Sequence, residues 1–490
     1  MIRLRHAILF FLLIILYQAK TFAQEGLLLY YMKNVPHVYQ LNPASQPNYN
    51  VFVGLPVLSA TAINLRSSSI TFSDFLIYNK DLDAPVLPLY SLETKQDFLN
   101  NFSKVNDFSA NLKSNLFSAG GKIDKFYLIF DASVVSNSRT TYPRDFVEFL
   151  LNGNSGGAEV SLDKFNFSST TYLETGLVFS MQINDQFRIG VHPKYLNGLF
   201  TFYNRKNESN LFISAENAQL TIKNQYRIGL PRIEGLENHL TDSLLISDHP
   251  FNEITQTGIN SLPSIGPNWG LGLDLGVHYK PFPKLTTSLS ITNLGFINWR
   301  GLNFDAQIDG SYNFEGIELN SKYMLGDDYG NNYLMSVLDS VNYSANNNYF
   351  VQALYPQFYL GGLFTVTPEL EIGLVSATKL YRETVKEDLH LSLNFRANPG
   401  YSFSIGYNLI QKGRGNLSFG LGYKLLILNS YFVVQGIPLQ YDRVTIKSLN
   451  IKGFTPKILL PVDLYGMNFR FGLNLAFGNT EKQKKNDINR

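Results

Sequence analysis

The chain contains no cysteine, which excludes disulfides, thiolate metal ligands and a cysteine nucleophile. Charged residues make up only 16% of its 490 residues, well below the level usual in soluble domains. The 41 basic and 39 acidic residues leave a formal charge of +2, which is too near balance to predict a nucleic-acid partner. Tryptophan occurs only twice, whereas the chain has 29 Tyr, 37 Phe and 37 Gly. Beyond residue 23 no apolar run approaches the length of a membrane-spanning helix.

Residues 1–23 have the features of a secretory signal. Basic residues precede the apolar run 7–16, and Thr21-Phe22-Ala23 places small residues where a signal peptidase cleaves. We therefore expect the chain to be exported and the signal removed. If the mature protein spans a membrane, it must do so as a closed β-barrel, because the barrel is the only structure besides the helix that pairs every backbone group in lipid.

Apolar and polar residues alternate in many segments. In 269–279 the odd positions are Trp, Leu, Leu, Leu, Val and Tyr, and the even positions are Gly, Gly, Asp, Gly and His. The same alternation recurs in 285–292, 389–396, 401–409, 416–427 and 465–477. Segments of about ten residues with one apolar face are typical of a transmembrane barrel, although a soluble β-sandwich also alternates. The polar face is rich in Gly, Ser and Asn, which suits a crowded or wet lumen.

Connection lengths give a second indication. From residue 184 onward, expected short turns alternate with longer connections such as 229–268, 319–349 and 438–463. The expected turns are Asn184-Asp185, 281–284, Asp309-Gly310, 367–369, 398–400 and Asn429-Ser430. Short turns on one side and long loops on the other are typical of outer-membrane barrels. We predict an all-β fold, a single antiparallel transmembrane β-barrel of about 14 strands (range about 14–16).

Some segments break the alternation and are not predicted to be strands. Segments 93–104 and 143–152, and more weakly 332–341, are predicted to be short helices in loops or in an N-terminal plug. The predicted divisions are a signal peptide (1–23), a periplasmic or N-terminal lumen segment (24–50), an outer-membrane barrel (51–480) and a charged periplasmic tail (481–490).

The stretch 34–44, Asn-Val-Pro-His-Val-Tyr-Gln-Leu-Asn-Pro-Ala, resembles the mature N-terminus of a family of Bacteroidota outer-membrane β-barrels of unknown function. Val53-Gly54-Leu55-Pro56 and the segment 270–299 are similar to that family too. The Asn-Pro-Ala element is also similar to one near the start of FadL-type transporters and of the PorV and PorP/SprF-type barrels of type IX secretion and gliding. The resemblance implies about fourteen strands, an N-terminal segment in or near the lumen, and either passage of hydrophobic solutes or a role in secretion.

The N-terminal element Asn42-Pro43-Ala44 is one candidate for a functional site. With Pro36 and Pro47 nearby, its proline content favours an irregular path. The resemblance implies a hatch in the lumen, and an ordinary periplasmic lead-in remains the alternative.

Charged and histidine residues on the polar faces are the other candidates for lumen or gate positions. They are Arg188, His192, Asp274, His278, His390, Lys424 and Arg470. A charge facing lipid at mid-membrane costs about 2–4 kcal/mol, so these side chains are expected to face inward. There they either pair or set channel selectivity, and pairing is favoured because an unpaired buried charge is costly. The histidines lack the close spacing of a metal motif, which favours lumen lining over metal binding.

No catalytic motif is present that would predict an enzyme. The chain has no Gly-x-Ser-x-Gly elbow and no phosphate-binding loop pattern, and no cofactor is implied. Two classes of function remain: a FadL-like channel for small, hydrophobic solutes, or a non-enzymatic accessory or scaffold barrel of type IX secretion, gliding or surface assembly. The expected partners are outer-membrane lipid together with such a solute or secretion-system components.

Overall fold

The computed structural model describes the chain from residue 26 to residue 478, with gaps. The described residues are 26–71, 74, 77–79, 84–86, 92–152, 159–213, 218–231, 266–314, 341–346, 348–382, 384–398, 400–410, 416–439, 441–445, 457–461 and 464–478. The predicted signal peptide and the predicted charged tail lie outside them. So does the predicted helix 332–341, except for its last residue, which begins a strand.

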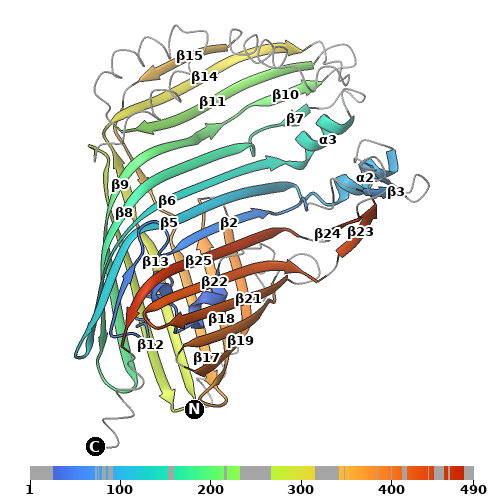
Figure 1. Cartoon of the computed structure of the whole chain (residues 1–490). Coiled ribbons are helices and arrows are strands. Elements are labelled where there is room, and N and C mark those ends of the chain that lie inside the picture. The colour runs from blue at the N-terminus through green and yellow to red at the C-terminus, as the bar shows by residue number, and fades with distance from the viewer. Residues whose placement is uncertain are drawn as a thin grey trace, which may run out of the picture.

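The core of the fold is a closed antiparallel β-barrel of 14 strands, which confirms the predicted fold class (Figure 1). The ring closes because β25 pairs with β22 on one side and with β1 and β2 on the other. Two positions in the ring are each occupied by a pair of collinear segments, β1 with β2 and β16 with β17. In ring order the strands are β1 (Val51–Gly54) with β2 (Thr61–Ser67), β5 (Val105–Ile123), β6 (Phe126–Pro143), β8 (Asn166–Gln182), β9 (Phe187–Asn207), β12 (Trp269–Phe282), β13 (Leu285–Trp299), β16 (Phe350–Ala353) with β17 (Gln357–Thr365), β18 (Leu370–Leu380), β19 (Val385–Asn398), β20 (Tyr401–Asn408), β21 (Asn416–Leu425), β22 (Leu428–Pro438) and β25 (Gly466–Phe477).

The alternation in the sequence separates an apolar outer face from a polar inner face. Along β12, Leu271, Leu275 and Tyr279 are exposed, whereas Asp274 and Gly276 are buried. The same pattern runs along β8, β18 and β20. An apolar surface around a closed ring with no open edge is what lipid requires of a spanning protein. The fold is therefore that of a transmembrane β-barrel.

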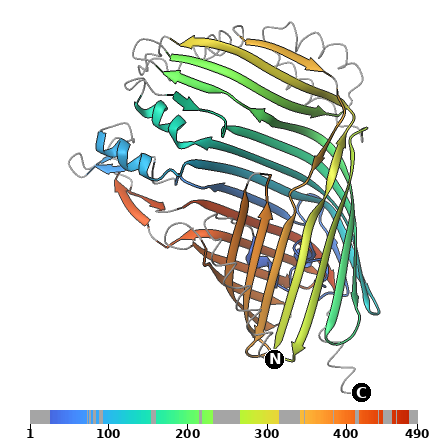
Figure 2. The same ribbon diagram turned by 180° about the vertical axis from the view of Figure 1, so that it is seen from behind.

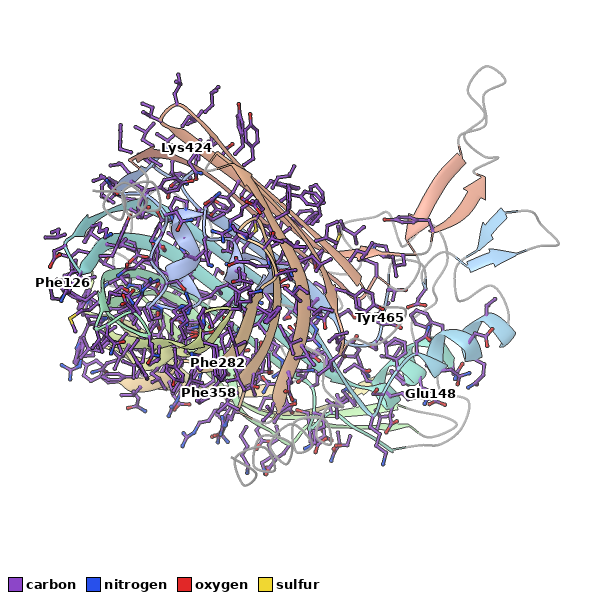
Figure 3. The ribbon with its side chains drawn as sticks, turned by 90° about the horizontal axis from the view of Figure 1, so that it is seen from below. Phe126, Glu148, Phe282, Phe358, Lys424 and Tyr465 are labelled. Atoms are coloured by element: carbon purple, nitrogen blue, oxygen red, sulfur yellow. The ribbon has the colours of Figure 1, made fainter. Side chains whose placement is uncertain are left out.

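Aromatic side chains mark the end of the barrel where the short turns lie. Phe126 and Phe282 are 45% and 65% exposed and stand next to two of these turns (Figure 3). Others at this end are Phe187, Tyr279, Phe364, Tyr401, Tyr423 and Phe477. Aromatic rings prefer the membrane–water interface, so these residues form one girdle of a membrane-embedded barrel.

At the opposite end the sheet extends beyond the ring (Figure 2). β9 pairs with β12 along its first part and with β11 along its last part, so a branch of the sheet begins there. The branch contains β7 (Glu159–Ser161), β10 (Asn210–Ile213), β11 (Ala218–Leu230), β14 (Leu302–Phe314) and β15 (Val341–Asn346). In the described part of the chain, two α-helices and two small hairpins also lie at this end: α2 (Leu92–Asn100), α3 (Arg144–Asn152), β3 (Ile77–Asn79) with β4 (Ala84–Val86), and β23 (Tyr441–Thr445) with β24 (Lys457–Pro461). The two α-helices overlap the segments 93–104 and 143–152 that the sequence predicts to be helical.

Two predicted turns are wrong. Asp309-Gly310 lies inside β14 and pairs with Lys223 and Ile222 of β11. Asn429-Ser430 lies inside β22, and the turn before it instead follows Leu425. In both places the pairing of a neighbouring strand overrides the local turn preference of the residues.

Among the described residues, no helix combines the length and the apolar character needed to cross a membrane.

Candidate functional site

Residues 26–50 lie inside the barrel as a plug, which is the blue segment enclosed by the strands in Figures 1 and 2. The plug contains two short 3-10 helices, η1 (Leu27–Tyr31) and η2 (Pro36–Gln40). Leu28 and Tyr39 are fully buried, as is most of the segment. The prolines that disfavour a strand thus occur in a compact irregular segment. Its apolar residues fill the part of the lumen nearest the short turns.

Polar contacts bind the plug to strands all around the ring. Lys33 pairs with Glu371 of β18, with Nζ 2.7 Å from Oε1. Further contacts join Tyr30 to Ser288 (3.0 Å), His37 to Ser118 (3.1 Å), Tyr39 to Asp131 (3.2 Å), Ser45 to His278 (3.0 Å), and the carbonyls of Leu41 and Ala44 to the hydroxyls of Ser290 (2.7 Å) and Ser180 (3.2 Å). Because each such bond is worth about 1 kcal/mol, the plug is held by many small contributions.

The Asn42-Pro43-Ala44 element rests on two glycines of the wall. Gly190 of β9 and Gly276 of β12 are directly opposite each other in the antiparallel ladder. A Cβ atom on Gly190 would lie 2.2 Å from the backbone of Pro43 and Ala44, and one on Gly276 would lie 2.1 Å from Oδ1 of Asn42. Only glycine admits so close an approach, so this pair forms the seat of the plug.

A chain of buried charges runs along the wall from the centre of the lumen to the plug. Glu174 accepts from Lys113 (2.8 Å) and Lys194 (3.2 Å), and Lys194 also contacts Asp274 (2.6 Å). His192 then joins Asp274 (3.2 Å) to Asp131 (3.1 Å). Tyr39 of the plug donates to the second oxygen of Asp131. All these groups except Lys113 are 5% exposed or less.

The geometry favours the charged form of His192. Its two ring nitrogens each lie within hydrogen-bond distance of a carboxylate oxygen. An ionised carboxylate only accepts, so two such neighbours stabilise the imidazolium, in which both nitrogens donate. With Lys113 and Lys194, His192 supplies three positive charges against the three carboxylates of the chain. The network is therefore neutral as a whole, as burial demands.

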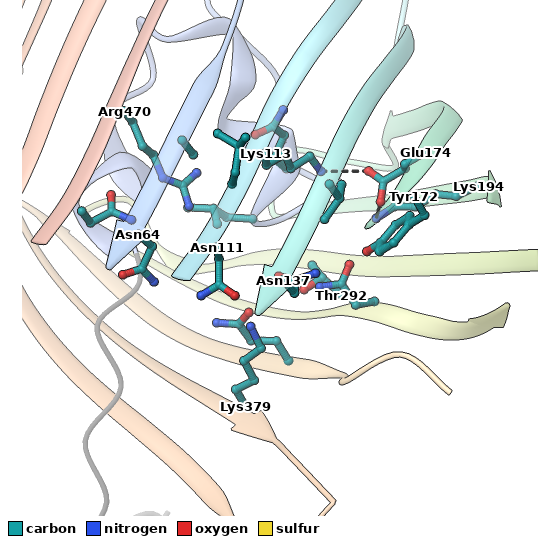
Figure 4. Close-up of a pocket in the computed structure, with 18 of the residues that line it drawn as sticks. Asn64, Asn111, Lys113, Asn137, Tyr172, Glu174, Lys194, Thr292, Lys379 and Arg470 are labelled. Carbon is teal, nitrogen blue, oxygen red and sulfur yellow. Dashed lines mark hydrogen bonds and ion pairs between the residues drawn. The ribbon is translucent and has the colours of Figure 1, made fainter. Parts of the chain in front are cut away.

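Three cavities follow one another from the loop end down to the plug. The outer one, about 440 Å³, is lined by Arg139, Tyr203 and Tyr381, and the middle one, about 60 Å³, shares Arg139 and Tyr381 with it. The inner cavity, about 120 Å³, shares Tyr172 and Lys379 with the middle one and reaches Gln40 and Leu41 of the plug (Figure 4). Their shared walls mark a path into the lumen that ends on the plug.

The candidate residues predicted from the sequence fall into separate groups. His192 and Asp274 belong to the buried charge network. Arg188 and His278 face each other in register near the short turns, where Arg188 donates to Gln182 (2.7 Å). On other parts of the wall, His390 contacts Ser418 (3.1 Å), Lys424 lies over the ring of Tyr49 (4.7 Å), and Arg470 lines the inner cavity.

The network is completed by four residues that were not predicted from the sequence: Lys113, Asp131, Glu174 and Lys194. Each occupies an inward position of its strand, and Glu174 is the single charged residue of β8. A charged residue at an inward position of an alternating strand is the signal that would have indicated them. Among the residues that the structure describes, no group of three or more histidine or acidic side chains is placed to hold a metal ion.

The pKa of His37 indicates how the stability of the seated plug depends on pH. Burial, together with the nearby Lys113, lowers the pKa of His37 to about 3 from its usual 6.5. A released plug therefore binds a proton below pH 6.5 that the seated plug does not bind. Seating is at full strength above this pH, and between pH 7 and pH 5 it weakens by about 2 kcal/mol. We expect single-channel recordings to show more openings at pH 5 than at pH 7, and His37→Asn to reduce this dependence, with His278, which contacts Ser45 of the plug, contributing the remainder. A dependence as steep in H37N as in the parent protein would contradict the prediction.

The fold and the lumen define a transmembrane β-barrel that holds its own N-terminal segment inside the ring. The chain belongs to the family of unknown function DUF5723, whose model matches residues 43–434.

No curated protein matches the chain. Among solved structures, a Pseudomonas aeruginosa FadL homologue is similar, with 11% identity, coverage of 89% of this chain and 93% of that chain, and a TM-score of 0.39. The toluene transporter TodX of P. putida has 10% identity, covers 94% and 96% of the two chains and has a TM-score of 0.39. At these TM-scores the likeness carries no argument about function.

Proposed function

We propose that this chain is an outer-membrane channel for small solutes and that residues 26–50 gate it. The observation that supports this most is the seat of the plug, where Asn42-Pro43-Ala44 rests on Gly190 and Gly276 below the inner cavity. A segment held by many weak bonds, with cavities leading to it from the loop end, has the construction expected of a gate.

We also propose where the protein is located and that it is not an enzyme. Residues 1–23 direct export, and the barrel inserts into the outer membrane, as the resemblance to Bacteroidota barrels implies. We propose no enzymatic activity. The resemblance also favours hydrophobic solutes.

A second candidate is an accessory or scaffold barrel of type IX secretion, gliding or surface assembly. The observation that favours it is the filled lumen, because Leu28, Tyr39 and their neighbours occupy the space that an open pore would need. The branch of the sheet that contains β11, β14 and β15 would then offer a surface to partners. Under this alternative the plug is a permanent part of the core and never leaves its seat.

Locking the plug distinguishes the two candidates. The chain has no native cysteine, so Ser45→Cys and His278→Cys place two unique thiols where the native side chains meet at 3.0 Å. We expect the double variant in planar bilayers to show brief openings that a short, reducible thiol crosslinker abolishes and a reductant restores. The control is S45C alone with the same reagent. Openings that continue in the locked protein would contradict the gate. Absence of current in every form would favour the scaffold.

A further inference from the structure

The walls of the inner cavity are polar. Asn137, Asn293 and Tyr172 lie around it together with several further amides and hydroxyls (Figure 4). These further groups belong to Asn64, Asn111, Thr292, Gln357, Tyr359 and Asn468. Such groups can form hydrogen bonds with a polar solute. An apolar solute would displace the water bound to them without replacing its hydrogen bonds, which costs free energy.

Positive charge dominates the same walls. Among the described residues that line the cavity, four are cationic and one is acidic: Lys113, Lys194, Lys379 and Arg470 against Glu174. The carboxylate of Glu174 is already occupied, because one oxygen contacts Lys113 and the other contacts Lys194. Lys194 also contacts Asp274, so Lys113 and Lys194 are both neutralised within the buried network. The excess positive charge of the cavity wall therefore comes from Lys379 and Arg470.

Arg470 is the cation best placed to hold a ligand. It projects from β25, between Ala62 on one neighbouring strand and Val433 on the other, toward the inner cavity. Its Nε is buried beside Gly26 of the plug and has no hydrogen-bond partner in the part of the chain that the structure describes, while the residue itself lines the cavity. A carboxylate is the group whose geometry matches a guanidinium that lines a cavity.

Cations also line the path from the outer cavity to the inner one. The guanidinium carbon of Arg139 lies 4.3 Å from the ring centre of Tyr381, and Nζ of Lys379 lies 5.4 Å from the same ring centre. Arg139 lines the outer and middle cavities, and Lys379 lines the middle and inner ones. An anion that moves inward thus passes Arg139, which also pairs with Asp107 at 3.5 Å, and then Lys379 before it reaches Arg470.

We propose that the lumen selects polar, carboxylate-bearing solutes and binds them at Arg470 and Lys379, directly above the plug. This inference rests on the proposed channel function and names its class of solute. It differs from the hydrophobic solutes that the family resemblance implies, because the cavity walls carry amides, hydroxyls and cations.

Uptake of three six-carbon sugar derivatives of nearly equal size tests the inference. The full chain in proteoliposomes is offered radiolabelled glucuronate, glucose and glucosamine, which are anionic, neutral and cationic. We expect glucuronate to enter about fivefold faster than glucose and glucosamine to enter slowest, an effect on the scale of one charge interaction near a protein surface. In the double variant Arg470→Gln, Lys379→Gln the preference for glucuronate over glucose should disappear.

Two further variants serve as controls. Arg470→Lys keeps the charge but loses the planar guanidinium, so it should keep more of the preference than Arg470→Gln, which a merely structural role of the guanidinium would not predict. Lys284→Gln removes an exposed cation in the turn between β12 and β13, outside the three cavities, and should leave all rates unchanged. Equal rates for the three sugar derivatives would overturn the anion site and leave the channel intact. Uptake of none of them, even after the plug is released by a substitution in its glycine seat, would overturn both proposals.

Discussion

Asp274→Ala is expected to destabilise the barrel by about 3–5 kcal/mol, the usual cost of removing one partner from a buried ion pair. Asp274 is 1% exposed and accepts from Lys194 and His192. Its other oxygen accepts from the backbone N–H of Asn293 at 2.7 Å. The substitution would leave the positive charge of His192 with Asp131 alone, and it would remove a bond that holds a strained residue.

That strained residue is Asn293, whose φ of 60° is unusual for a side chain inside a strand. It occupies a bulge of β13, where the register with β12 shifts around Asp274. A bulge held by a buried carboxylate is a local deformation that the surrounding structure must maintain. Asp274→Asn keeps the shape and one acceptor, so we expect it to cost less than the alanine substitution.

Unfolding in urea, followed by the gel shift between the folded and the boiled barrel, measures the effect. The matched control is Asp185→Ala, which removes a carboxylate from an exposed turn and should change the free energy of unfolding by less than about 0.5 kcal/mol. If D274A unfolds within about 1 kcal/mol of the parent protein, the network does not contribute as its geometry indicates.

The sequence was sufficient to predict the barrel because a strand in lipid has little freedom. One face must be apolar along its whole length, and the resulting alternation can be seen in Leu271, Leu275 and Tyr279 without any knowledge of neighbouring strands. The turns were harder to place. Asp-Gly is a strong local turn signal, yet Asp309-Gly310 is paired on both sides, by β11 and by β15. Contacts far apart in the sequence decided that position.

The site could be predicted only in part for the same reason. Alternation places Asp274 and His192 on inner faces, but whether they meet depends on the register of β12 against β9. Asp131 and Glu174 come from β6 and β8, and their distances to His192 and Lys194 depend on two more registers. The glycine-rich inner face, which suggested a crowded or a wet lumen, is explained at Gly190 and Gly276 by contact with the plug.

Gly276→Val is expected to unseat the plug and raise the open probability of the channel by about five- to 150-fold. The first added carbon would lie 2.1 Å from Oδ1 of Asn42 and 3.0 Å from the backbone nitrogen of Ala44. Overpacking of this kind costs about 1–3 kcal/mol, and each 1.4 kcal/mol is about a tenfold change in an equilibrium. The cost falls on the seated plug and not on the ring, because the new side chain points into the lumen.

Gly362→Val is the matched control. It makes the same substitution in β17 of the barrel wall, at a position where an added Cβ atom would meet no described atom within 4 Å. Single-channel recording of both variants in planar bilayers separates an effect on the plug from a general effect of valine on a strand. Gly190→Val approaches Pro43 and Ala44 from the opposite strand and should reproduce the result of G276V. If G276V and G362V conduct alike, the element 42–44 does not close the channel. The plug would then be a fixed part of the core, as the scaffold alternative requires.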